Sequence, residues 1–176
     1  AMLKDFFTAG PTDDGDAVTG HYYEVASPDP ARPQVWVYAS ALSYSPGEEL
    51  VLHAMSSAPQ ARLTIARDGL NPEILLQATL ATTFAVTPFD ASESGCHWPV
   101  VLRLRIPDDW QSGVYTLTVR IPGHSSQGMF ILKPLKPQSK ILMLLATGTW
   151  CAYNDWGGSN HYQGLTGPEQ GDFAPH

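Results

Sequence analysis

The sequence predicts an all-β fold, an immunoglobulin-like antiparallel β-sandwich followed by the truncated first strand and loop of an α/β domain. Short apolar segments recur between Pro, Gly, Ser and Asp residues, no segment keeps a long helical period, and a continuous apolar run follows a lysine- and proline-rich stretch. The predicted parts are an acidic N-terminal arm (1–20), a sandwich (21–132), a linker (133–140) and the truncated start of a catalytic-type domain (141–176).

The arm contains the acidic, turn-forming stretch from Gly10 to Asp16 and shows no sustained periodicity. From residue 21 onward the pattern becomes that of strands. Apolar runs of strand length occupy residues 21–25, 35–38, 50–54, 63–66, 74–80, 83–86, 101–106, 114–121 and 129–132. Several short strands separated by turn residues are typical of two packed antiparallel sheets.

The alternation of side chains predicts which face of each strand is buried. Leu102 and Leu104 alternate with Arg103 and Arg105, so we expect the leucines to face the core and the arginines to face solvent. By the same rule Leu52, Tyr115, Leu117 and Val119 point inward. The strand at 50–54 is preceded by Ser45-Pro46-Gly47, which predicts a turn.

Tyr115 stands at the start of a predicted strand, directly after the loop 107–113. This is the position of a tyrosine corner, in which the hydroxyl donates a hydrogen bond to backbone a few residues upstream. The alternative is an ordinary core tyrosine.

The pattern changes in kind after the linker 133–140. Residues 141–146 read I-L-M-L-L-A, which is continuously apolar and suits a strand buried on both faces, with a short helix as the alternative. Residues 157–176 are rich in Gly, Ser, Asn and Pro and offer no partner strand. We therefore expect a chain truncated after the first strand and loop of a larger domain.

Charge and composition exclude several classes of function. A net charge of -7 disfavours contact with phosphate backbones, so we expect no nucleic-acid partner. No apolar run approaches the roughly 20 residues that span a bilayer, and no secretory signal is present, which predicts a soluble, cytoplasmic protein without membrane contact. Cys96 and Cys151 fall in different predicted domains, and we expect both to be free thiols.

The common catalytic and metal-binding motifs are absent. The histidines show no metal-ligand spacing, and there is no nucleophile elbow, Walker loop or dinucleotide-binding glycine pattern. Cys151 follows a predicted strand end, but no base can be assigned to it, which argues against a cysteine nucleophile.

The segment 147–159 reads T-G-T-W-C-A-Y-N-D-W-G-G-S and gathers aromatic side chains and glycines after a buried strand. Such a loop can form the wall of a pocket. It can equally pack its aromatic side chains on a neighbouring domain.

This segment resembles the start of the catalytic domain in the N,N-dimethylformamidase large (beta) subunit-like family. The likeness is carried by the apolar strand, T-x-T-W and A-Y-N-D-W-G-G, and the segments 44–48 and 107–115 are similar to that family's N-terminal region. The resemblance implies an amidohydrolase acting on linear amide C–N bonds of small substrates. The resemblance also implies a mononuclear iron held by two tyrosines and a glutamate. A phenolate is a hard anionic ligand, which suits a ferric ion acting as a Lewis acid.

By its place in the motif, Tyr153 resembles the first of those tyrosines. Tyr162 is a poorer match for the second, which should lie further along, and no residue matches the glutamate. We therefore expect iron only in the intact parent protein, no cofactor and no activity in this fragment, and the remainder of the polypeptide as its principal partner, with homo-oligomers also possible.

A competing hypothesis is a free-standing module that binds a ligand such as a carbohydrate. Trp36, Tyr38, Trp98 and Trp110 could line its surface, although these side chains are more typical of packing in or near a core. The apolar run at 141–146 favours the truncated enzyme, since a binding module has no use for it.

Overall fold

The computed structural model describes residues 26–88, 90–137 and 139–153. The chain divides into two compact units. The described part of the sandwich unit comprises residues 26–87, 97–137 and 139–142, and the described part of the second unit comprises residues 88, 90–96 and 143–153. Among the described residues, every strand belongs to the sandwich unit, while the short helices α2 (Ala91–Ser94) and α3 (Thr147–Tyr153) belong to the second. None of the helices described is long and apolar enough to cross a membrane.

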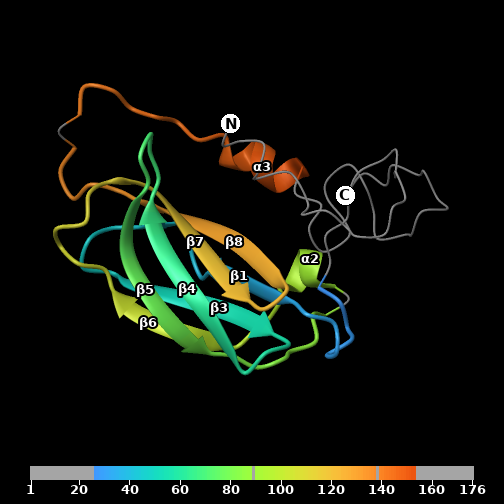
Figure 1. Ribbon diagram of the computed structural model, residues 1–176. Coiled ribbons are helices and arrows are strands. Elements are labelled where there is room, and N and C mark those ends of the chain that lie inside the picture. The colour runs from blue at the N-terminus through green and yellow to red at the C-terminus, as the bar shows by residue number, and fades with distance from the viewer. Residues whose placement is uncertain (1–25, 89, 138, 154–176) are drawn as a thin grey trace. The chain divides into compact units, whose positions relative to one another are not determined.

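The sandwich unit consists of two facing sheets (Figure 1). The first sheet has the order β1-β3-β6, with β1 at Val35–Ala39, β3 at Glu49–Ser56 and β6 at Val100–Arg105. The second has the order β2-β8-β7-β4-β5, with β2 at Ser43–Tyr44, β8 at His124–Leu132, β7 at Gly113–Ile121, β4 at Gln60–Arg67 and β5 at Glu73–Ala81. The predicted immunoglobulin-like β-sandwich is confirmed.

One strand pair departs from the predicted antiparallel pattern. β2 pairs with β8 in parallel, with Ser43 opposite Ile131 and Tyr44 opposite Leu132. The chain leaves β1 in the first sheet and joins the second sheet within a few residues, so it reaches β8 without a hairpin reversal. A two-residue strand carries no period, which is why the sequence did not predict it.

The predicted inward faces are confirmed. Leu52, Tyr115, Leu117 and Val119 are fully buried, and the second strand of the first sheet also buries Leu50 and Ala54. In β6, Leu102 and Leu104 are half-buried against the core, while Arg103 and Arg105 are exposed. Side chains from both sheets thus fill the space between them, and full burial of a large apolar side chain contributes roughly 1.5–3 kcal/mol.

Two predicted strands differ from the structure, and a third lies outside it. Residues 83–86 form no strand, although Ser56 donates its N–H to the carbonyl of Thr83 at 3.0 Å.

Residues 141–146 were expected to form a strand buried on both faces, and this prediction is wrong for the described chain. They form no strand, and Ile141 and Leu144 are 87% and 90% exposed. A strand needs a paired neighbour for its backbone, and no described segment pairs with this one. The predicted strand at 21–25 lies outside the described residues.

The predicted turn before β3 is confirmed by its backbone. Gly47 has φ +84°, the conformation that the third position of a type II turn requires, and Pro46 precedes it. Glu48 donates its N–H to the carbonyl of Ser45 at 3.1 Å, and the Glu48 carboxylate accepts from the Ser45 N–H at 2.8 Å. The turn is joined to the residue that follows β6, because Gly47 donates its N–H to the carbonyl of Ile106 at 2.9 Å.

The tyrosine corner is present. The fully buried Tyr115 donates its hydroxyl to the carbonyl of Gln111 at 2.6 Å. Burial raises the pKa of Tyr115, which keeps the hydroxyl protonated as a donor. Its ring stacks between Trp110, at a centroid distance of 5.3 Å, and Phe130, at 5.0 Å. The Arg67 guanidinium holds the same loop by donating twice to the carbonyl of Ser112.

We predict that Tyr115→Phe lowers the free energy of unfolding by about 1–2 kcal/mol, since it keeps the ring but leaves the Gln111 carbonyl without its partner. Urea denaturation of both proteins measures the difference. An unchanged midpoint would show that the corner contributes nothing to stability.

Candidate functional site

The segment with the strongest functional pattern in the sequence begins as a short helix rather than a loop. Helix α3 covers Thr147–Tyr153, and Trp150 donates its N–H to the carbonyl of Ala146 at 3.0 Å. Trp150 is half-buried and Cys151 is exposed. The rest of the A-Y-N-D-W-G-G motif lies beyond the described residues.

The predicted metal ligand Tyr153 is the last residue of α3, and its side chain lies outside what the structure describes, as does all of Tyr162. Within the described ranges no three His, Cys, Asp or Glu side chains are grouped so that they could hold a metal ion. These four residue types therefore form no metal site within the described ranges, and no chemical step is assigned to an iron. Cys96 and Cys151 are free thiols, as predicted.

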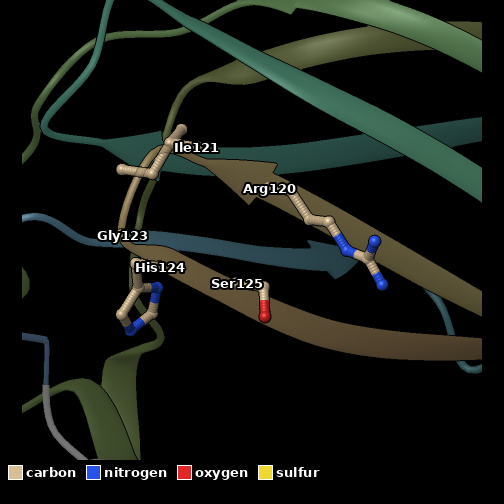
Figure 2. Close-up of a pocket in the computed structure, with 5 residues that line it drawn as sticks. All are labelled: Arg120, Ile121, Gly123, His124 and Ser125. Carbon is tan, nitrogen blue, oxygen red and sulfur yellow. The ribbon is translucent and has the colours of Figure 1, made fainter.

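A shallow hollow of about 350 Å³ lies at the turn between β7 and β8, lined by Arg120, Ile121, Gly123, His124 and Ser125 (Figure 2). The Arg120 side chain points away from His124, so the polar groups do not converge. His124 Nδ1 accepts the N–H of Val35 at 3.2 Å, which ties β8 to β1. This histidine has a structural role, and the hollow has few features of a binding site.

A second group of polar and aromatic side chains lies on the outer face of the first sheet. Ser40 Oγ is 2.8 Å from His53 Nε2, and His53 Nδ1 is 2.8 Å from the carbonyl oxygen of Trp98. The Tyr38 ring stacks on the His53 ring with an interplanar angle of 5°. No pattern in the sequence predicts this group, because its members come from three separate segments and no spacing motif links them.

The four aromatic side chains considered for a ligand surface are placed differently. Trp98 is buried, with only 4% of its surface exposed, and Trp110 stacks on Tyr115. Trp36 and Tyr38 are half-buried, and Trp36 contacts the His124 ring. They do not form a flat, exposed aromatic surface.

A match to a known protein family shows which family this chain belongs to. The family described as N,N-dimethylformamidase beta subunit-like, C-terminal, matches residues 63–175, which is more than half of the chain. The chain belongs to this family. The resemblance noted on A-Y-N-D-W-G-G is thereby confirmed, and the matched range runs from within β4, through the rest of the sandwich and α3, into the motif.

Other comparisons add little to this family assignment. No curated protein matches the chain. One solved structure that resembles it is a mutant beta-glucosidase from Listeria innocua in complex with laminaribiose, at 10% identity and a TM-score of 0.32. The alignment covers 71% of this chain and 20% of that enzyme, and a likeness this low carries no argument about function.

The environment of His124 predicts a pH dependence of stability. Burial, and then the positive charge of Arg32, lower the pKa of His124 below its ordinary value. Only an unprotonated Nδ1 can accept from Val35 N–H, so the fold favours the neutral ring. Because the pKa is lower in the folded state than in the unfolded chain, this stabilisation is complete above the unfolded value of about 6.5 and declines as the pH falls through the folded value.

We predict that His124→Asn, whose side-chain oxygen can still accept from Val35 N–H, loses less stability than the wild-type protein between about pH 8 and about pH 5. Urea denaturation at the two pH values measures both slopes. The variant loses the contact with Trp36 and is expected to be less stable at neutral pH. Equal pH slopes would contradict the assignment.

Proposed function

We propose that this chain provides the accessory β-sandwich and the beginning of the catalytic domain of an N,N-dimethylformamidase-like amidohydrolase, which acts on the C–N bond of small linear amides in the cytoplasm. The observation that carries the proposal is the continuity of the family match, which covers both the sandwich strands and the A-Y-N-D-W-G-G segment in the single range 63–175.

The apolar segment after the linker supports the proposal that further parts of the polypeptide cover it. Ile141, Leu142, Met143 and Leu144 are 87%, 89%, 74% and 90% exposed. Large apolar side chains in contiguous exposed stretches mark surfaces that are normally covered. The remainder of the same polypeptide is the natural cover, since this segment leads directly into the motif.

The alternative, a free-standing module that binds a carbohydrate, lacks support from the structure. Such modules need exposed aromatic rings, whereas Trp98 is buried and Trp110 is engaged by Tyr115. The exposed apolar segment would also have no purpose in a separate binding module.

We predict that the 176-residue chain alone does not hydrolyse N,N-dimethylformamide, because none of its residues matches the family's glutamate ligand and its motif resembles only the start of the catalytic domain. A longer polypeptide continuing past His176, expressed in the presence of iron, should release dimethylamine. Quantifying the amine from both proteins tests the proposal. Metal-dependent amine release by the 176-residue chain would overturn it.

We further predict that Tyr153 is an iron ligand in the longer polypeptide. A ferric phenolate absorbs visible light, so the purified protein should be coloured, and Tyr153→Phe should lose colour, iron and activity. Elemental analysis and the visible spectrum measure the outcome. Full retention of iron by Tyr153→Phe would make this residue a packing side chain.

A further inference from the structure

We propose that Ser40 is a nucleophilic serine that takes an acyl group from small activated esters, with His53 as its general base and the Trp98 carbonyl as the group that orients the imidazole. The site lies on the outer face of the first sheet. It requires neither iron nor Tyr153, so its test is independent of the proposed amidohydrolase function.

The hydrogen bonds fix the tautomer of His53. A carbonyl oxygen can only accept, so the 2.8 Å contact with Trp98 requires the proton to be on Nδ1. In the neutral ring Nε2 then carries no proton and can accept from the Ser40 hydroxyl, whose oxygen lies 2.8 Å away. A serine hydroxyl that donates to a neutral imidazole, which is itself oriented by a third group, is the arrangement that activates serine nucleophiles.

Ser40 and His53 are held by the pairing of β1 with β3. Tyr38 lies opposite His53 in the register, and Ser40 continues the ladder by donating its N–H to the carbonyl of Val51 at 3.0 Å. The pairing of β3 with β6 shifts between Leu52 and His53. Such irregularities occur next to active sites, where they redirect a side chain. The Tyr38 ring, 4.9 Å from the imidazole centroid, further restricts the orientation of His53.

The position of the Trp98 carbonyl is also restrained by its neighbours. His97 immediately before it has φ +52°, the only positive φ among the non-glycine residues that the structure describes. This conformation costs energy for a residue with a Cβ, and such strain gathers at functional sites. The Trp98 ring is buried, and its Nε1–H donates to Thr87 Oγ1 at 3.1 Å. The next carbonyl, that of Pro99, accepts from Ala54 N–H at 3.1 Å.

The chemistry balances without a further reagent. Ser40 is exposed, so an ester can reach Oγ. As Oγ attacks the acyl carbonyl, its proton passes to His53 Nε2, and the resulting imidazolium keeps Nδ1–H on the Trp98 carbonyl. The bond from the acyl carbon to the leaving oxygen then breaks, the leaving group departs as a phenolate or alcohol, and water can later release the acyl group by the reverse transfer. The expected substrates are activated esters, because their good leaving groups require the least stabilisation of the developing oxyanion.

The test uses the 176-residue protein and p-nitrophenyl acetate. We expect an initial burst of one equivalent of p-nitrophenol per chain and an acetyl group on the peptide that contains Ser40, identified by mass spectrometry. Ser40→Ala should lose the labelled peptide. His53→Gln retains a polar group near the Nε2 position but cannot act as a base, and it should slow acetylation about 100-fold or more.

Ser125→Ala is the matched control, because Ser125 is also exposed and has no histidine partner among its described hydrogen bonds. It should react at the wild-type rate. Thermal melting confirms that each variant is folded, and if His53→Gln does not fold, Ser40→Ala and the position of the label decide alone. Wild-type acetylation of Ser40→Ala, or a label spread over lysines and other serines, would overturn the proposal and leave the Ser40–His53 contact an ordinary surface hydrogen bond.

Discussion

The loop before β7 is tied to the core through one buried hydroxyl. Burying Tyr115 between the sheets without a partner for its oxygen would cost about 1–3 kcal/mol. The carbonyl of Gln111 supplies that partner. With the ring in place, Trp110 stacks on one side and Phe130 on the other, and the edge of Tyr44 meets Phe130 at 5.7 Å. A single hydrogen bond thereby sets the position of four rings that connect the loop before β7 with β8 and β2.

The same core determines what faces outward. Because Leu52 and Ala54 must point inward, His53 must point outward, and Tyr38 opposite it does the same. The outer face of the first sheet thus receives two rings and, one step further along the ladder, the Ser40 hydroxyl. The reactive group proposed here is a consequence of the period of the strands together with the irregularity at His53.

Much of the sandwich could be predicted from the sequence, since the alternation of Leu102 with Arg103 or of Tyr115 with Thr116 states directly which face is buried. The turn at Gly47 and the corner at Tyr115 were likewise visible as local patterns. The strand predicted at residues 141–146 was wrong because continuous hydrophobicity indicates a preference for burial, whereas a strand also needs a neighbouring strand to pair with. The Ser40–His53–Trp98 group could not be foreseen, because its geometry depends on strand register and on the backbone at His97, neither of which leaves a mark in the sequence.

The two charged residues on β6 have a consequence for how the protein behaves at high concentration. β6 lies at the edge of the first sheet, where unpaired backbone could join the strand of another molecule. Arg103 and Arg105 are exposed along it, and Arg103 is paired with Glu49 at 2.8 Å. Arg105 likewise lies 3.6 Å from Asp108, and such charged, hydrated side chains along an edge strand disfavour the addition of a strand from a second copy.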